Sequence, residues 1–188
     1  TARAFFQRAG FRVVAAQRVQ RRGVALENFR MVRALPPRPT LRAATNADRA
    51  AVERLIATAL AEYGLRFDPT GTDAELADIE VSYGAAGGAF SVLVDDSGRV
   101  VGSVGILRRT DSVCELRKMY LEASARGAGE GRRLLEHALD CARALGFQRV
   151  ILQTASVLRE AIALYERRGF RPYVPEKLSY RCDAAYAL

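Results

Sequence analysis

The chain has 188 residues, 49% of them hydrophobic, and a formal net charge of +8, which suffices for one full domain with a small appendage. No apolar run approaches the roughly 20 residues of a membrane-spanning helix, and no secretory leader opens the chain, so we expect a cytoplasmic protein. One histidine and three widely spaced cysteines provide neither a zinc ligand set nor a disulfide framework.

The positive charge is concentrated at the start of the chain. Residues 1–38 hold nine arginines against Glu27, and residues 39–188 balance to zero. A neutral main domain has no field that attracts a phosphate backbone, so we do not expect nucleic-acid binding, although a basic leader that contacts an acidic partner remains an alternative. Lys118 and Lys177 stand against 27 arginines, which suggests a GC-rich bacterial genome.

The leader, residues 1–35, predicts a helix over 2–9, a strand over 11–20, a turn at Gly23 and a second strand up to Leu35. Residues 36–39 contain three prolines and predict a stiff linker.

The leader also repeats a later part of the chain. Residues 2–12 align without a gap on residues 161–171 and are identical at six of eleven positions. Residues 1–38 therefore resemble the last helix and hairpin of a second copy of the domain at 39–188. The alternative is two unrelated amphipathic helices that each end in Gly-Phe. We expect the hairpin to dock on the main domain's sheet or on a partner chain, most simply in a homodimer.

The main domain opens with a strand over 40–44 and a helix over 47–63 with one apolar face. Thr72-Asp73-Ala74-Glu75 has the pattern of a capping box and predicts a second helix through Tyr83. Strands over 90–94 and 100–108 follow, joined by the turn at 95–98.

A glycine-rich stretch follows the strand predicted over 115–121. Gly127, Gly129 and Gly131 let the backbone approach a ligand, and they precede a helix that runs to about Leu145. The first turn of a helix offers unpaired N–H groups and the positive end of its dipole. The stretch therefore predicts a phosphate or pyrophosphate site.

The remainder predicts a strand over 150–154, a helix over 158–168 ended by Gly169 and a final strand over 178–188. This order of strands and helices predicts an α/β (α+β) fold, in which helices cover both faces of a mixed sheet.

Two motifs carry a family resemblance. Arg126–Gly131 matches Gln/Arg-x-x-Gly-x-Gly/Ala, and Ala161–Phe170 matches Ala-x-x-Leu-Tyr-x-x-x-Gly-Phe. Residues 40–188 thus resemble the GNAT superfamily of acyl-CoA-dependent N-acetyltransferases. The resemblance implies an enzyme without a metal that moves an acetyl group from acetyl-CoA to a primary amine, by direct attack in a ternary complex. No Cys–His pair is evident for a covalent route.

The resemblance also implies the roles of particular residues. Tyr165 becomes the general acid at the sulfur, and a backbone N–H among Met119, Tyr120 and Leu121 faces the thioester oxygen. Glu115, eleven residues before Arg126, takes the place of the base in histone-acetylating relatives, or is simply a solvated residue at a strand start. The predicted acetyl-CoA contacts are Met119, Tyr120, Leu121, Arg126, Gly127, Ala128, Gly129, Glu130, Gly131 and Arg132.

Two departures, together with the partial repeat at residues 1–38, motivate a second hypothesis. Glu130 suits the helix dipole but repels a pyrophosphate unless it points away, and Leu158 stands where many members have an asparagine. A non-catalytic acyl-CoA sensor or interaction module is therefore the alternative function.

The acceptor pocket is the least defined part. Residues 53–80 contain seven acids against Arg54 and Arg66, which suggests a cationic small-molecule or peptide amine, although solvated helix faces explain the same charges. Tyr63, Phe67 and Tyr83 either line this pocket or belong to the core. We expect His137 on the surface of its helix.

Overall fold

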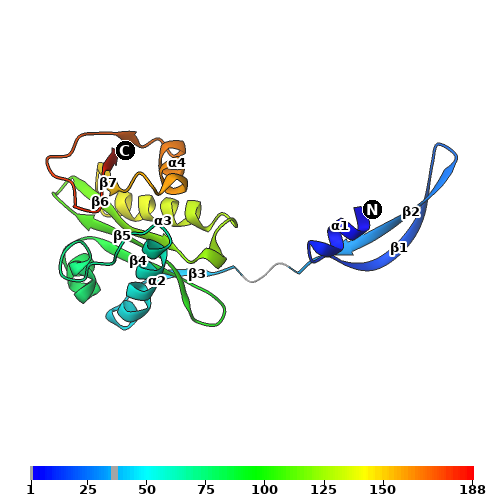
Figure 1. Cartoon of the computed structure of the whole chain (residues 1–188), viewed down its shortest axis with the longest axis horizontal. Coiled ribbons are helices and arrows are strands. Elements are labelled where there is room, and N and C mark those ends of the chain that lie inside the picture. Colours follow the sequence, from blue (N-terminus) through cyan, green and yellow to red (C-terminus); the bar gives the residue numbers. More distant parts are fainter. Residues whose placement is uncertain (1, 35–37) are drawn as a thin grey trace. The chain divides into compact units, whose positions relative to one another are not determined.

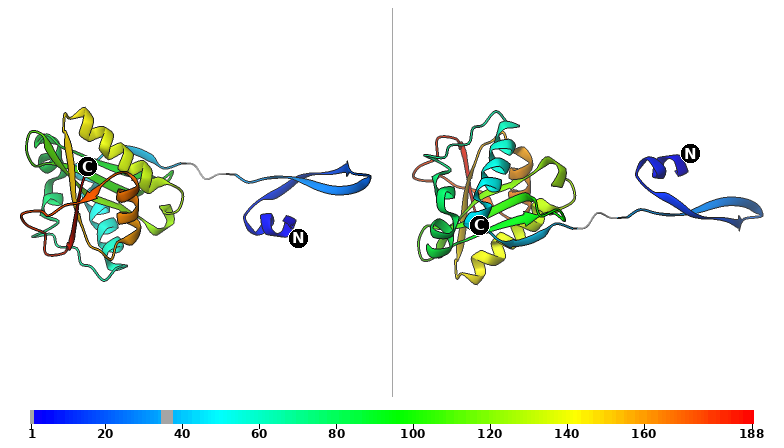
Figure 2. Two further views of the ribbon diagram at one scale, coloured as in Figure 1. Left: turned by 90° about the horizontal axis from the view of Figure 1, so that it is seen from above. Right: turned by 90° about the horizontal axis from the view of Figure 1, so that it is seen from below.

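The structure is a computed structural model that describes residues 2–34 and 38–188. The chain divides into two compact units, Thr1–Pro37 and Arg38–Leu188. In the first unit, helix α1 (Ala2–Arg8) precedes an antiparallel hairpin of β1 (Arg12–Arg21) and β2 (Val24–Val32). Figure 2 shows α1 beside this two-stranded ribbon. The predicted helix and hairpin are confirmed, while residues 35–37, at the strand end and in the linker, lie outside the described part.

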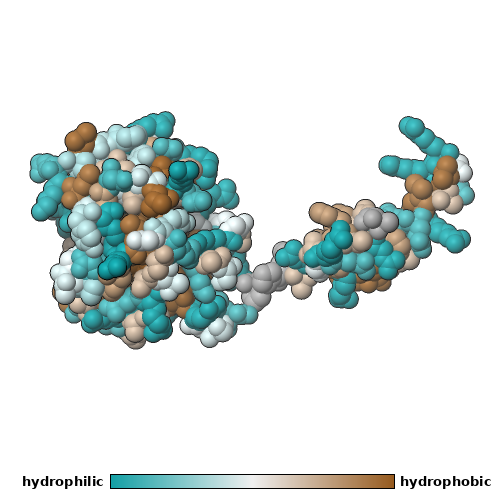
Figure 3. All heavy atoms as spheres, in the orientation of Figure 1, coloured by the Kyte–Doolittle hydropathy of each residue, from teal (hydrophilic) through white to brown (hydrophobic). Residues whose placement is uncertain are grey.

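The first unit leaves its apolar side chains on the surface. None of the seven residues of α1, all of them described, is buried, and Phe5 and Val24 are 61% and 57% exposed. Figure 3 shows brown, apolar side chains on the surface of this unit. A two-stranded hairpin without a core is marginally stable in water, so this unit needs another surface to cover it.

The first unit also repeats local geometry from the main domain. The Phe11 amide donates to the Phe6 carbonyl at 3.0 Å, and the Phe170 amide donates to the Tyr165 carbonyl at 3.1 Å. In both places the residue before the donor is a glycine with positive φ. The sequence repeat between residues 2–12 and 161–171 therefore extends to the backbone.

The second unit contains a seven-stranded sheet in the order β3-β4-β5-β6-β7-β9-β8. The strands are β3 (Thr40–Ala43), β4 (Ala89–Val94), β5 (Val100–Arg108), β6 (Val113–Leu121), β7 (Arg149–Thr154), β8 (Arg171–Pro172) and β9 (Ala184–Ala187). Within the described residues, β6 and β7 form the one parallel pair. The predicted mixed sheet is confirmed.

Helices cover both faces of this sheet. Figure 1 shows α3 (Glu130–Ala144) and α4 (Arg159–Arg167) on one side and α2 (Arg49–Ala61) on the other. Strand β4 illustrates the two cores, because Leu93 packs in the cluster of α3 whereas Phe90 and Val92 pack in the cluster of α2. Alternating apolar residues therefore join both layers to the same strand.

The predicted helix over residues 72–83 is wrong. Residues Ala74–Asp78 form a 3-10 helix and Glu80–Ala85 a π-helix. The carboxylate of Glu75 does not close a capping box with Thr72, because it forms ion pairs with Arg117 and Lys118 of β6. Without that cap, the segment forms two short, irregular turns.

The end of the chain also differs from its prediction. The strand expected over 178–188 is shortened to Ala184–Ala187, and β8 was not foreseen. Side-chain bonds hold the preceding loop: Ser156 donates its amide and hydroxyl to Asp183, and the Ser179 amide donates to Gln153. In the described part of the chain, no helix combines the length and hydrophobicity required to span a bilayer.

Candidate functional site

A cavity of about 560 Å³ opens where β6 and β7 separate. Within the described residues the two strands pair at three positions, the last being Glu115 with Ile151. Beyond that point β6 and β7 no longer pair with each other, and residues 116–121 and 152–155 line the space between them. The cavity therefore occupies a wedge that the sheet itself leaves open.

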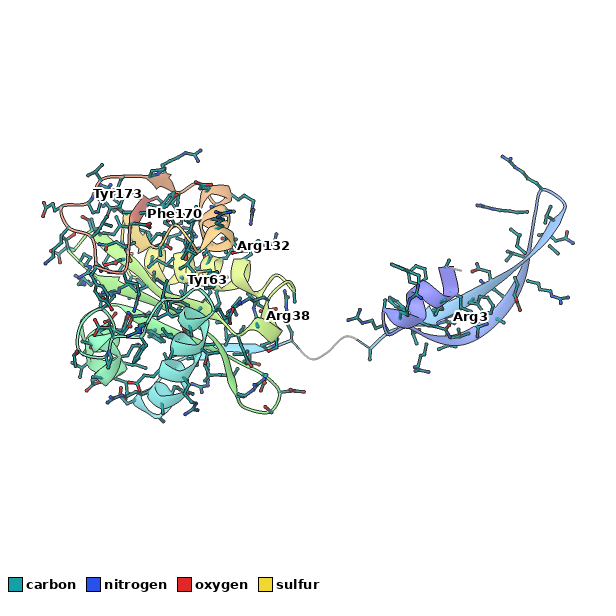
Figure 4. All side chains as sticks on the ribbon, viewed as in Figure 1. Arg3, Arg38, Tyr63, Arg132, Phe170 and Tyr173 are labelled. Carbon is teal, nitrogen blue, oxygen red and sulfur yellow. The ribbon has the colours of Figure 1, made fainter. Side chains whose placement is uncertain are left out.

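The glycine-rich loop closes one part of the cavity. Gly127 and Gly129 have φ of +79° and +89°, a conformation that favours glycine. Of residues 126–132, all of them described, five line the cavity: Arg126, Gly127, Gly129, Gly131 and Arg132. Figure 4 shows Arg132 on α3 and Tyr63 after α2, two of the lining residues. The start of α3 and the side chain of Arg132 thus border the same part of the cavity.

Ala128 and Glu130, both predicted as cofactor contacts, are absent from that lining. Glu130 is 3% exposed, and its carboxylate accepts hydrogen bonds from Arg38 Nε at 3.1 Å and Arg133 Nη1 at 3.0 Å. Arg38 and the start of α3 lie together in Figure 4. The Glu130 side chain thus turns toward the beginning of the domain, where two guanidinium groups neutralise its charge.

Arg126 fixes the loop to its neighbours. Its guanidinium donates to the Leu121 carbonyl at 2.8 Å and 3.0 Å, and to Glu62 at 2.5 Å and 3.0 Å. The bond from Arg126 lowers the pKa of the Glu62 carboxyl. The side chain of Arg126 therefore ties the glycine loop to the end of α2.

Tyr165 lies in α4 and faces the same cavity. It is buried, and its hydroxyl is 4.0 Å from the sulfur of Met119 on β6. Burial raises the pKa of Tyr165 above its ordinary value, so the phenol keeps its proton at neutral pH. The structure thus brings Tyr165 beside the predicted residues Met119 and Leu121.

Glu115 is buried rather than solvated. It lines the cavity, and its Oε2 accepts two hydrogen bonds from the guanidinium of Arg109, one of them from Nε at 2.6 Å. A buried carboxylate needs such a partner. The structure therefore places a paired carboxylate at the point where β6 and β7 separate.

A β-bulge interrupts β6 directly after Arg117. The register with β5 shifts between Ser103 and Gly105, and Lys118 has φ of +52°. The Ser103 hydroxyl donates to the Lys118 carbonyl at 2.7 Å and holds the bulge closed. The bulge adds one residue to β6, so the consecutive side chains of Arg117 and Lys118 both reach the Thr72 carbonyl.

These side chains form an ionic cluster that the sequence did not reveal, which we call the Asp73 cluster. Its members are Asp73, Glu75, Arg117, Lys118 and Arg181. Asp73 accepts from Lys118 Nζ at 2.5 Å and from Arg181 Nη1 and Nη2 at 2.8 Å each. Glu75 lies 3.1 Å from Arg117 Nε and 3.2 Å from Lys118 Nζ.

Asp73 is the centre of this cluster. Burial alone would raise the pKa of Asp73, but the hydrogen bonds from Arg181 and Lys118 outweigh it and lower the pKa to about 2. Burial, with the charge of Arg117, lowers the pKa of Lys118. In the sequence, the cluster is indicated by the two acids at positions 73 and 75, and these fall within the segment that was interpreted as a capping box.

The aromatic residues proposed for the acceptor pocket lie partly in the cavity and partly in the core. Tyr63 lines the cavity, Tyr83 is fully buried in the core and Phe67 packs against the same core. His137 is half-buried rather than on the surface, because its Nε2 lies 2.9 Å from the Ser91 hydroxyl. It also lies 3.6 Å from the sulfur of Cys141, a Cys–His contact that the sequence did not predict.

The acids between residues 53 and 80 are engaged within the protein. Each accepts a hydrogen bond or an ion pair: Glu53, Glu62, Asp68, Asp73, Glu75, Asp78 and Glu80. Their charges therefore stabilise the structure and are not directed freely into the cavity.

The sequence profile of the acetyltransferase (GNAT) family matches residues 52–170. The chain is 41% identical over 140 residues to a relative from Escherichia coli named uncharacterized N-acetyltransferase YjgM, covering 72% of the chain and 83% of that relative. It is 40% identical over 90 residues to the IAA acetyltransferase of Azospirillum brasilense, covering 44% of the chain and 59% of that relative.

Solved structures share the fold. A GNAT-family acetyltransferase from Staphylococcus aureus superposes with a TM-score of 0.73 at 20% identity, covering 79% of this chain and 97% of its own. The yncA acetyltransferase from Salmonella typhimurium, solved with acetyl-CoA, superposes with a TM-score of 0.62 at 25% identity, covering 81% and 94%.

Asp73→Asn tests the ionic cluster through pH. Because the folded pKa of about 2 lies below the ordinary 3.8, the charge stabilises the fold above pH 4, and this stabilisation is lost as the pH falls through 2. The linked contribution is about 2 kcal/mol. In urea unfolding, the difference in free energy of unfolding between wild type and variant should therefore decrease by about 2 kcal/mol from pH 5 to pH 2. Asp96→Asn, at an exposed turn, should show no such trend; a constant gap for Asp73→Asn would contradict the assignment.

Proposed function

We propose that this chain, which belongs to the acetyltransferase (GNAT) family and is an acyl-CoA-dependent N-acetyltransferase, moves the acetyl group of acetyl-CoA directly to a primary amine. The observation that carries the proposal is the wedge between β6 and β7, with the glycine loop and Tyr165 on its walls. A thioester and an amine that meet in this wedge lie beside a protonated phenol and a buried carboxylate.

The residues of the glycine loop fit the anionic part of acetyl-CoA. Positive φ at Gly127 and Gly129 exposes the backbone, α3 contributes its N-terminal N–H groups, and Arg132 lines the cavity. Glu130 does not oppose this fit, since Arg38 and Arg133 bind its carboxylate away from the cavity. When bound, acetyl-CoA supplies the acetyl group as an activated thioester.

The chemistry assigns a proton to each end of the transfer. The acceptor ammonium first loses one proton, which we assign to Glu115, directly or through water. As the nitrogen–carbon bond forms and the carbon–sulfur bond breaks, the Tyr165 hydroxyl gives its proton to the leaving sulfur, and the second proton released by the nitrogen restores the phenol. A backbone N–H in Met119–Leu121 stabilises the oxyanion.

The cysteines support direct transfer over a covalent intermediate. Burial raises the pKa of Cys114 to about 11 and also raises the pKa of Cys141 and Cys182. A thiol needs a lowered pKa to act as a nucleophile near pH 7. His137, which contacts Cys141, does not belong to the residues that line the described cavity.

Tyr165→Phe tests the acid. We expect kcat, measured by release of free CoA thiol, to fall about 100-fold or more, while acetyl-CoA still raises the melting temperature as in wild type. Tyr173→Phe, outside this cavity, is the matched control and should keep its activity. Unchanged turnover in Tyr165→Phe would refute the acid role, and binding without transfer by the wild-type protein would support a sensor instead.

Glu115→Gln tests the base. We expect kcat/KM to fall about 100-fold at pH 7. The ratio of the wild-type kcat/KM to that of the variant should decrease as the pH rises, because the acceptor amine then loses its proton to solvent without the carboxylate. Arg109→Gln breaks the same ion pair but keeps the carboxylate, and should lose far less activity. A deficit in Glu115→Gln that stays constant with pH would indicate a structural role.

We also propose that residues 1–38 are a partial copy of the domain's C-terminal helix and hairpin, that residues 39–188 form the complete domain, and that the partial copy covers its apolar side chains in a homodimer. The exposed Phe5 and Val24 support this proposal. A helix and a two-stranded hairpin without a buried core are marginally stable in water, and a second copy of the chain would cover these apolar side chains.

The variant Phe5→Ser/Val24→Thr tests the homodimer. Light scattering after size exclusion should show a dimer for the wild type and a monomer for the variant at equal concentration. Gln17→Ser, exposed on the same hairpin, should remain dimeric. A monomeric wild type, or a dimer that survives both substitutions, would refute the proposal.

A further inference from the structure

We propose that the acceptor amine carries a carboxylate and that this carboxylate binds the free edge of the Arg181 guanidinium. The inference rests on the proposed function and names the class of its acceptor. It starts from the wall that the Asp73 cluster forms along the cavity, where Arg117, Lys118 and Arg181 line the space between β6 and β7.

The hydrogen bonds of Arg181 determine which of its donors are free. A guanidinium has five N–H donors. Nη1 donates to the Arg66 carbonyl and to Asp73 Oδ2, both at 2.8 Å, and Nη2 donates to Asp73 Oδ1 at 2.8 Å. Among the residues that the structure describes, no acceptor faces Nε or the second hydrogen of Nη2. These two donors lie on one edge of the guanidinium and match the two oxygens of a carboxylate.

Hydrogen bonds to Asp73 and to the Arg66 carbonyl fix the orientation of the Arg181 guanidinium. Its side chain is 7% exposed and that of Asp73 is 0% exposed, so the bidentate pair is shielded from water. Lys118 binds the same carboxylate from β6 and spends its own donors on Thr72, Asp73 and Glu75. Lys118 therefore orients Asp73. Arg117 engages its Nε with Glu75 and its Nη2 with Thr72, so Arg181 is the arginine of the cluster whose Nε edge is left for a ligand.

The charge of the wall favours an anion. The cluster contains three cations and two carboxylates, and hence carries a net charge of +1. The nearby carboxylate of Glu115 is neutralised by Arg109. An acceptor with a second positive charge would meet repulsion here, whereas a carboxylate would complete the charge balance in a partly buried site. The earlier expectation of a cationic acceptor rested on acids that are engaged within the protein.

Arginine recognition is selective for carboxylates over neutral isosteres. A carboxylate presents two charged oxygens to the two donors of one guanidinium edge, whereas a carboxamide presents one neutral oxygen and an NH₂ group that opposes the other donor. Amino acids and their carboxamides therefore differ at the one group that Arg181 would bind.

The experiment measures thiol release with three matched acceptor sets: α-amino acids, the carboxamides of the same amino acids, and diamines. We expect kcat/KM for the best amino acid to exceed that for its carboxamide by about tenfold or more. The carboxamide amine loses its proton more readily, so its intrinsic reactivity works against this preference. Equal or better use of carboxamides or diamines would overturn the inference.

Arg181→Gln should raise KM for the amino acid about tenfold or more while KM for the carboxamide changes less than twofold. Arg181→Lys keeps the charge and should recover part of the loss. Arg99→Gln, an exposed arginine paired with Asp95 and Glu122, is the matched control and should leave both KM values unchanged. An equal rise for both acceptors in Arg181→Gln would contradict a carboxylate contact.

The outcomes separate the two proposals. Thiol release with carboxamides or diamines, and none with amino acids, would refute the carboxylate contact but keep the acetyltransferase function. Absence of thiol release from all three sets, with acetyl-CoA bound, would refute the proposed transfer itself. Should Arg181→Gln fail to fold, the comparison of acceptor sets on the wild-type protein still decides the inference.

Discussion

The bulge at Lys118 is the constraint on which the rest of the site depends. One extra residue in β6 reverses the alternation of its side chains. Before the bulge, Leu116 packs on the side of α3, and after it Met119 and Leu121 do so. Arg117 and Lys118 both turn to the opposite side, where Lys118 pairs with the buried carboxylate of Asp73 and Arg117 pairs with Glu75. This one bulge thus places Met119 and Leu121 in one wall of the cavity and the charged Arg117 and Lys118 in another.

Charge neutralisation within the fold explains why an acid can stand in an anion-binding loop. The start of α3 stabilises the negative charge of Glu130, and Arg38 and Arg133 bind both of its oxygens. Arg126 is similarly satisfied by Glu62 and the Leu121 carbonyl. The proposed anion site would therefore depend on backbone N–H groups and Arg132, which is consistent with a loop built from glycines.

The sequence predicted those parts of the fold that follow from local periodicity. The hairpin of β4 and β5, the strand β6 and the helix α3 have strong alternating or helical patterns, and the glycine loop between them was placed correctly. The Asp73 cluster could not be predicted, because its members come from three distant segments and a bulge aligns them. Asp73 and Glu75 were misinterpreted since a capping box and a half-buried ion cluster have the same local sequence. Arg181 carries no local signal at all.

The charged wall also bears on the reactivity of an amine. Burial lowers the pKa of Lys118, and the charge of Arg117 lowers it further. In the proposed function, an amine bound against the same wall experiences both effects, which favour its neutral, nucleophilic form. The proposed carboxylate of the acceptor offsets the repulsion that this wall exerts on a cation, so that binding and deprotonation do not oppose each other. Under these two proposals the net positive wall serves recognition and activation together, and Glu115 accepts a proton whose binding to the amine the site already disfavours.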